Sequence, residues 1–303
     1  MSGIFDLLKN EAAPKKRSAV YPMSGADTAA FVTPSETAET EPSERDVSET
    51  PPANVISLTR DKEEIVPAGE FDFSNATLQM QRAMDPGTIL GEQFRILRTR
   101  LSLLQKQSGI KTVLITSTFP QEGKSFTSYA LAGIIAQEQG KRVIVIDADL
   151  RKLGSGREYG IDMTGGINGT TQVLQGTSEF RKALLKSVDP EFWFLPSGGL
   201  PPNPSELLSS SEMEKMLQFA SERFDWVIVD SPPSLALSDP NLIAPLCDTV
   251  VFVVRANSTP AKLALEAMNK IGRERICGVV LNRKKQMHSS RHYYQYYYYQ
   301  KQK

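Results

Sequence analysis

An α/β fold, with a mostly parallel β-sheet flanked by helices, is predicted for residues 85–285 by two observations on the sequence. Short runs of β-branched and other apolar residues recur along this region without polar alternation, as is typical of strands buried on both faces. Segments with apolar residues at helical spacing separate these runs. Strands and helices that alternate in this way form parallel sheets with right-handed crossovers.

The predicted elements follow one another in a regular order along the chain. An amphipathic helix comes first, because apolar residues recur at steps of three and four from Leu90 to Leu104. Strands are expected at 112–116, 143–146, 226–229, 249–254 and 278–281, with a weaker one at 192–195. Helices are expected at 125–138, 211–223 and 261–272. The second of these begins with the capping-box pattern of Ser211 and Glu214.

Both ends of the chain are expected to lie outside this domain. The arm at 1–84 leans acidic and is largely rich in Pro, Ser and Thr, so it has too few apolar residues to offset its chain entropy and is predicted to be disordered. The tail at 286–303 is predicted to be flexible and basic. It holds six of the nine tyrosines of the chain: Tyr293, Tyr294, Tyr296, Tyr297, Tyr298 and Tyr299. Taken alone, the tail could also be a merely adhesive low-complexity end.

Bulk properties narrow the class of protein. The 303 residues carry no formal net charge, so no nucleic-acid partner is expected. Cys247 and Cys277 lie beside apolar runs and are interpreted as small buried side chains, which agrees with a reducing cytoplasm. No stretch approaches the roughly 20 apolar residues that span a bilayer. We therefore expect a cytoplasmic protein that meets a membrane only through a partner or a surface contact.

A phosphate-binding loop is predicted between the first strand and the next helix. The chain reads Gly123-Lys124-Ser125 at this point, although Thr118 stands where the GxxxxGK[ST] pattern usually has its first glycine. In such a loop, backbone N–H groups and the helix N-terminus hold phosphate oxygens, Lys124 reaches the terminal phosphates and the Ser125 hydroxyl binds Mg²⁺. The residues expected to bind nucleotide are Gln121, Glu122, Gly123, Lys124, Ser125 and Phe126. The sequence therefore predicts a P-loop NTPase fold.

Carboxylates follow two other strands of the predicted sheet. Asp147 and Asp149 end the second strand and Asp230 ends the third. Because the carboxyl ends of parallel strands face one crevice, we expect these side chains to gather around Lys124 and a Mg²⁺ ion. The alternative is that these aspartates only cap the turns that follow. Asn282 and Arg283 also follow a strand and could contact the adenine edge, although an ordinary loop is the default interpretation for them.

These motifs together resemble those of the bacterial tyrosine kinases of the capsular and exopolysaccharide type, which are P-loop proteins related to the MinD and ParA ATPases. The resemblance covers about residues 85–300. It rests on Pro120–Ser125 as Walker A, Ile146–Arg151 as the second Walker element, Val229–Pro233 as Walker B, Glu92–Arg98 as an ExxRxxR helix, the Leu195–Gly198 and Pro201–Leu208 segments, and the tyrosine tail. Gln121 and Phe126 depart from this pattern, since glycine and threonine are common there.

The resemblance implies an autokinase that uses ATP and Mg²⁺. By this resemblance Lys124 and Ser125 hold phosphate and metal, while Asp149 and Asp230 serve the metal directly or through water. Asp147 orients or deprotonates the incoming tyrosine hydroxyl. The catalytic residues implied are thus Lys124, Asp147, Asp149 and Asp230.

The resemblance also implies partners. Family members form rings through the helix that carries Glu92, Arg95 and Arg98, and the tail of one subunit enters the neighbour's site until phosphorylation dissolves the ring. They work with a membrane polysaccharide co-polymerase, which is expected here as a separate chain that recruits the kinase to the inner face of the membrane. The implied role is regulation of exopolysaccharide or capsule synthesis or export.

Two other functions fit parts of the sequence. A positioning ATPase like MinD or ParA would carry a second lysine early in the loop, where this chain has Phe119, and would lack the tyrosine cluster. A nucleotide-gated scaffold of polysaccharide assembly would use the tail only as an interaction surface. Transfer of labelled phosphate from ATP to tyrosine separates the kinase from both alternatives.

Overall fold

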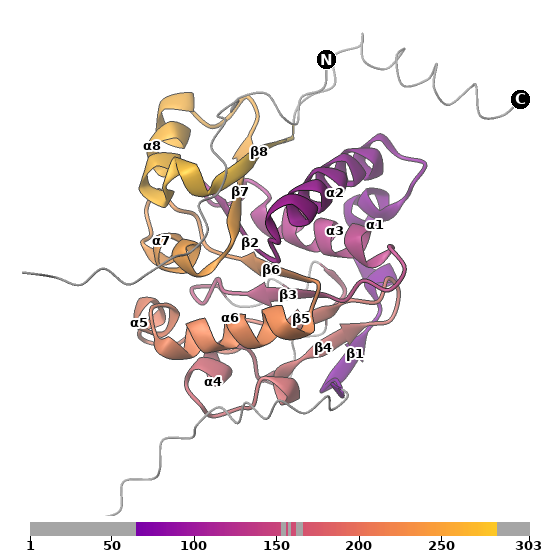
Figure 1. Cartoon of the computed structure of the whole chain (residues 1–303), viewed down its shortest axis with the longest axis vertical. Coiled ribbons are helices and arrows are strands. Elements are labelled where there is room, and N and C mark those ends of the chain that lie inside the picture. The colour runs from indigo at the N-terminus through magenta and orange to yellow at the C-terminus, as the bar shows by residue number, and fades with distance from the viewer. Residues whose placement is uncertain (1–64, 153–155, 157–158, 162–165, 284–303) are drawn as a thin grey trace, which may run out of the picture. The chain divides into compact units, whose positions relative to one another are not determined.

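A computed structural model of the chain describes residues 65–152, 156, 159–161 and 166–283, and the predicted tyrosine tail lies outside them. These residues form an eight-stranded sheet with helices on both faces (Figure 1). The strands, in spatial order, are β1 (Gly69–Phe71), β4 (Leu185–Ser187), β5 (Trp193–Leu195), β3 (Val143–Asp147), β6 (Trp226–Asp230), β2 (Thr112–Ser117), β7 (Thr249–Arg255) and β8 (Ile276–Asn282). Neighbouring strands are parallel except for the antiparallel pair β4 and β5, which confirms the predicted mostly parallel sheet.

The helices of the described residues are α1 (Leu78–Met84), α2 (Ile89–Ser108), α3 (Lys124–Ala136), α4 (Thr170–Leu174), α5 (Pro204–Leu208), α6 (Ser211–Arg223), α7 (Asp239–Ile243) and α8 (Ala261–Ile271). Four helices, α2, α3, α6 and α8, confirm the predicted positions, whereas α1, α4, α5 and α7 were not predicted. The capping residue of α6 is Ser210, one residue before the predicted Ser211, because the Ser210 side chain accepts the hydrogen bond from the Met213 N–H. The Ser211 hydroxyl instead donates to Glu212.

Two hydrophobic cores lie on the two faces of the sheet. Helices α1, α2 and α3 cover one face, and α4, α6, α7 and α8 contribute to the core on the other. Strand β2 shows how one strand serves both cores, since Leu114 faces one of them while Val113 and Ile115 face the other. The central strands are buried along their whole length, as their unbroken apolar sequences predict.

The packed domain begins before the predicted boundary at residue 85. Strand β1 pairs with β4, and the short 3-10 helix Phe73–Asn75 and α1 follow it. Phe71 and Phe73 are buried, and both rings meet the Phe192 ring edge-on at 5.8 and 5.3 Å between centroids. The pairing of β1 with β4 and this aromatic cluster, rather than any local pattern, attach the segment to the sheet. No helix in the described ranges is both long and apolar enough to cross a membrane.

Candidate active site

The predicted phosphate loop connects β2 to α3. Gly123 caps the N-terminus of α3 with a φ of 95°, and Gln121 has a φ of 61°. A Cβ atom on Gly123 would lie 2.0 Å from Nδ2 of Asn282, so glycine is required here both for the backbone angle and for the space. The loop thus turns directly into a 13-residue helix. Its position at the helix N-terminus suits an anion such as phosphate.

Lys124 lies at the centre of the site. Its Nζ is 3.0 Å from Oδ2 of Asp149 and 3.4 Å from Oγ of Ser125. Burial works to lower the pKa of Lys124, but the carboxylates of Asp230 and Asp149 outweigh it, so the net shift is upward. The ammonium group therefore stays protonated and available to a phosphate.

The three predicted carboxylates gather around this lysine. Asp147 and Asp230 are paired in register at the ends of β3 and β6, and the Asp149 N–H donates to Oδ1 of Asp147 at 3.0 Å. All three are buried. The structure thus brings Lys124, Asp147, Asp149 and Asp230 together, as expected from strand ends that share one edge of a sheet.

Asp230 has an oxygen available for a ligand. Its Oδ1 accepts a hydrogen bond of 3.3 Å from Ser128 and the Ser125 hydroxyl also interacts with this carboxylate, whereas the buried Oδ2 has no hydrogen bond of normal geometry among the described residues. Burial raises the pKa of Asp230, and the attraction of Lys124 compensates this only in part. A buried carboxylate oxygen without a partner is costly unless a cation or a donor meets it. Asp230 is therefore better placed to hold a metal ion than Asp149, whose Oδ2 pairs with Lys124.

The oxygen donors near Lys124 fit Mg²⁺. This ion usually takes one or two protein carboxylates and fills its remaining positions with water and substrate phosphates. Ser125 and Asp230 supply such donors, and Asp149 lies next to them. Within the described part of the chain, no group of three or more His, Cys, Asp or Glu side chains forms a cage that could hold a metal alone. The oxygen donors of Ser125 and Asp230 suit an ion whose remaining positions are filled by water and phosphate oxygens.

Other predicted nucleotide-binding residues lie around the loop in different roles. Asn282 donates from Nδ2 to the Glu122 carbonyl at 2.8 Å, and its Oδ1 accepts from the Arg283 N–H. Gln121 is exposed on the loop. The Phe126 ring packs edge-on against Phe94 of α2, at 5.8 Å between centroids. The side chain of Phe126 therefore belongs to the core between α2 and α3, and only its backbone is placed to serve the phosphate site.

The ExxRxxR helix is α2. Arg95 pairs with Glu92 at 3.6 Å along the helix. Arg98 reaches the C-terminal end of α3, where its Nη1 donates to the Ile134 carbonyl at 3.3 Å, and its Nε lies 3.0 Å from Glu138 just after the helix. Arg98 thus ties α2 to the helix that begins at the phosphate loop. No second copy is present, so the predicted role of these residues between subunits stays a prediction.

An ion-pair cluster next to the site was missed by sequence reasoning. Arg151 holds the buried Asp239 with two contacts, from Nε at 2.6 Å and Nη2 at 2.9 Å, and Ser205 donates to the same carboxylate at 2.7 Å. This cluster fixes the chain just after Asp149 to α5 and α7. Arg151 and Ser205 stand within the motifs quoted above, but nothing in the sequence connects them to Asp239.

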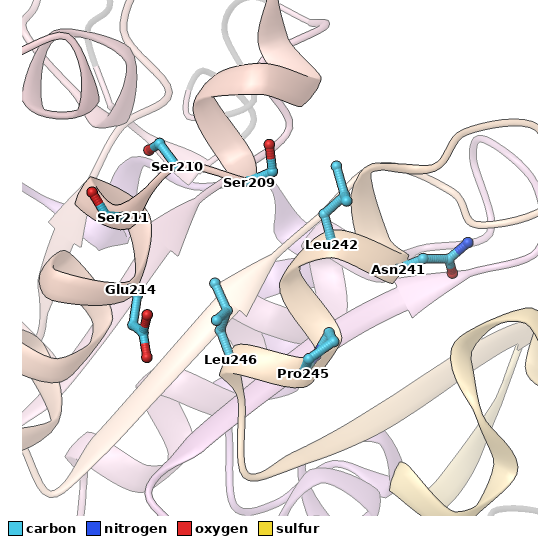
Figure 2. Close-up of a pocket in the computed structure, with 8 residues that line it drawn as sticks. All are labelled: Ser209, Ser210, Ser211, Glu214, Asn241, Leu242, Pro245 and Leu246. Carbon is cyan, nitrogen blue, oxygen red and sulfur yellow. The ribbon is translucent and has the colours of Figure 1, made fainter. Parts of the chain in front are cut away.

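A separate cavity of about 480 Å³ lies between the α5–α6 junction and α7. Figure 2 shows its lining, which comes from two sides of the cavity. The lining residues are Ser209, Ser210, Ser211, Glu214, Asn241, Leu242, Pro245 and Leu246. None of the predicted site residues is among them, so this cavity is distinct from the phosphate loop.

Comparison with known proteins places this site in a family. An AAA domain family matches residues 113–274. Tyrosine-protein kinase YwqD of Bacillus subtilis (strain 168) is 36% identical over 217 residues, which cover 70% of this chain and 90% of YwqD. The chain belongs to the bacterial tyrosine kinases. This confirms the family resemblance seen in the motifs, and it disfavours the positioning ATPases as the nearest functional class.

The sequence and the solved kinase domain of a further kinase show how far the likeness extends. Tyrosine-protein kinase etk of Escherichia coli (strain K12) is 34% identical over 201 residues, which cover 65% of this chain but 27% of that protein. The solved kinase domain of Escherichia coli tyrosine kinase ETK superposes with a TM-score of 0.62 at 28% identity, covering 74% of this chain and 94% of that domain. The likeness to etk is therefore confined to about a quarter of its length, whereas YwqD is matched over most of its length.

Proposed function

We propose that the chain is a Mg²⁺- and ATP-dependent protein-tyrosine autokinase that phosphorylates the C-terminal tyrosine cluster of a neighbouring copy. The observation that carries this proposal is the meeting of Lys124 with Asp147, Asp149 and Asp230 at a phosphate loop. Phosphoryl transfer asks a protein mainly for positioning and for neutralisation of charge. A buried ammonium group beside paired carboxylates supplies both.

Each residue has a distinct part in this proposal. Lys124 and the loop backbone hold the phosphates of the nucleotide. Ser125 and Asp230 hold Mg²⁺, with Asp149 close enough to act directly or through water. The bound ion would neutralise charge on the phosphate oxygens. Asp147 orients the incoming tyrosine hydroxyl or accepts its proton, which is needed because a phenol has a pKa near 10.

The proposed substrate segment starts beside the loop. Strand β8 ends at Asn282, whose side chain contacts the loop backbone. Tyr293 follows Arg283 by ten positions, and an extended chain over that many steps spans at most about 35 Å. The tyrosines can therefore reach a site on the same copy or on a neighbour. Their basic surroundings suit a site rich in carboxylates.

Assembly and regulation belong to the same proposal. We infer a ring of copies joined through Glu92, Arg95 and Arg98, and activation by a separate membrane polysaccharide co-polymerase that brings the kinase to the inner face of the membrane. Each phosphate adds about −1.5 to −2 charges at neutral pH. Phosphorylation of the cluster would reverse the charge of the tail and release it from the acidic site.

A mixing experiment tests the proposal. One variant carries Lys124→Met with an intact tail, and the other carries an intact loop with all six tail tyrosines changed to Phe. With labelled ATP and Mg²⁺, we expect neither variant alone to become strongly labelled, because one lacks the site and the other lacks the acceptors. The mixture should label the Lys124→Met chain on tyrosine.

The other outcomes identify the alternatives. Label that appears only when one chain carries both the loop and the tail would point to transfer within a copy. ATP hydrolysis without tyrosine labelling would indicate a positioning ATPase. Nucleotide binding with neither reaction would indicate the scaffold.

A further inference from the structure

Glu122 has a buried carboxylate that points into the protein rather than toward the phosphate site. It is 2% exposed, although it lies within the phosphate loop. Its Oε2 accepts hydrogen bonds from the backbone N–H groups of Thr118 at 2.7 Å and Phe119 at 3.0 Å. Glu122 therefore joins the two ends of the loop across its turn.

The same carboxylate also reaches the other side of the site. Its Oε1 accepts a hydrogen bond from the Thr259 hydroxyl, which stands in the connection between β7 and α8. The backbone carbonyl of Glu122 accepts from Asn282 at the end of β8. The N–H and O–H dipoles of Thr118, Phe119 and Thr259 thus stabilise the Glu122 carboxylate.

We propose that Glu122 and Thr259, the loop brace, are positioning residues that set the shape of the phosphate loop from behind. The inference rests on the proposed function, because it assumes that the loop binds the phosphates of a nucleotide. In it, Glu122 and Thr259 fix the geometry of the loop although neither side chain contacts nucleotide or tyrosine. The backbone amides expected to hold phosphate begin in the segment that the brace closes and continue directly after it into the N-terminus of α3. When the brace is broken, the amides lose their alignment and the phosphates are held less well.

The brace predicts a particular kinetic signature. The loop holds the nucleotide phosphates before and during transfer alike, so a loosened loop should mainly weaken nucleotide binding. Hydrogen bonds to an ionised carboxylate are stronger than those between neutral groups, and part of their loss appears as weaker nucleotide affinity. We expect Thr259→Val and Glu122→Ala to weaken binding of a fluorescent ADP analogue with Mg²⁺ by about tenfold. The KM for ATP should rise by a similar factor, while kcat changes much less.

Conservative variants separate this role from general damage. Glu122→Gln keeps the size of the side chain, and its amide can still accept from the loop N–H groups and donate to the Thr259 oxygen. We therefore expect it to bind the analogue within about twofold of the wild type. Thr259→Ser keeps the hydroxyl and should also retain affinity. Ser258→Ala, at the exposed neighbouring position, is the matched control and should change nothing.

A double variant completes the test. Because Glu122→Ala already removes the contact, adding Thr259→Val should weaken binding no further. Strictly additive losses would overturn the inference, and so would wild-type affinity in Thr259→Val or an equal loss in Glu122→Gln and Glu122→Ala. If Thr259→Val proves unfolded in a thermal melt, the comparison of Glu122→Gln with Glu122→Ala decides alone. Nucleotide affinity is measured here without any transfer to tyrosine. The inference about the loop brace can therefore be refuted while the kinase proposal stands, and the kinase proposal can be refuted while the brace is confirmed.

Discussion

Gly123→Ala tests how the phosphate loop and the end of β8 depend on each other. The substitution places a Cβ 2.0 Å from Nδ2 of Asn282, and it does so at a φ of 95°. The left-handed conformation destabilises the folded state with alanine by about 1–2 kcal/mol. Alanine also lowers the conformational entropy of the unfolded chain, which offsets about 0.5 kcal/mol of this loss. The Asn282 amide must also move away, and the loss of its hydrogen bond to the Glu122 carbonyl costs about 1 kcal/mol.

These contributions predict that Gly123→Ala lowers the free energy of unfolding by about 2 kcal/mol. Asn282→Ala alone should lower it by about 1 kcal/mol, because it removes the part-buried hydrogen bond to the Glu122 carbonyl, while the second bond it removes, from the Arg283 N–H, is exposed to solvent. In the double variant there is no amide left to displace. The combined loss should therefore be smaller than the sum of the two by about 1 kcal/mol.

Urea denaturation of the four proteins, followed by circular dichroism, measures this coupling. An exposed glycine with a positive φ and no atom near its Cβ provides the control: Gly140→Ala, at a φ of 76°, carries the backbone cost alone and should not couple to Asn282→Ala. Strict additivity of Gly123→Ala and Asn282→Ala would refute the reasoning, since the close approach of the amide would then have no energetic consequence.

Two further substitutions probe the contacts that sequence reasoning missed. Phe73→Ala should lower the free energy of unfolding by about 3 kcal/mol, because it empties part of the buried aromatic cluster. The control Leu78→Ala, at a side chain that is 63% exposed, should change it by about 0.5 kcal/mol or less. Equal effects of the two in urea denaturation would mean that the segment before residue 85 is not part of the cooperative domain. Asp239→Asn removes the ion pair with Arg151 and should lower the free energy of unfolding by about 2 kcal/mol above pH 4. The loss is no larger because Arg151 is partly exposed and can still be hydrated without its partner. Burial works to raise the pKa of Asp239, but hydrogen bonds from Arg151 and Ser205 outweigh it and lower that pKa, so the advantage of the wild type should shrink as the pH falls below about 4; a difference that stays constant down to pH 2 would contradict this.

The centre of the fold and the site could be predicted from the sequence because the local strand patterns and the geometry of a parallel sheet lead to the same arrangement there. Strands β2, β3 and β6 are unbroken apolar runs, and parallel strands place their carboxyl ends at one edge. The positions of Asp147 and Asp230 next to Lys124 follow from these two facts alone.

The edges of the fold could not be predicted in the same way. Strands β1 and β4 have three residues each, which is too short for a recognisable period, and pairing with distant partners stabilises them. The two contacts of Arg151 with Asp239 join positions 88 residues apart, and no local pattern encodes such a distance. Glu122 was expected among the phosphate ligands because of its place in the loop, but a loop residue can turn its side chain either way, and here it faces inward.

The charges at the site are not balanced by the folded chain alone. Three buried carboxylates surround a single ammonium group, and one oxygen of Asp230 has no hydrogen bond of normal geometry among the described residues. Folding alone therefore leaves an excess of carboxylate groups in a poorly hydrated place. A well-packed cluster of apolar side chains at the same position would not have this cost of desolvation. A cation restores the balance, and a cation that brings phosphates also occupies the loop amides. The excess charge is thus best understood as the part of the site that a metal–nucleotide complex completes, since packing of the two cores requires none of these side chains.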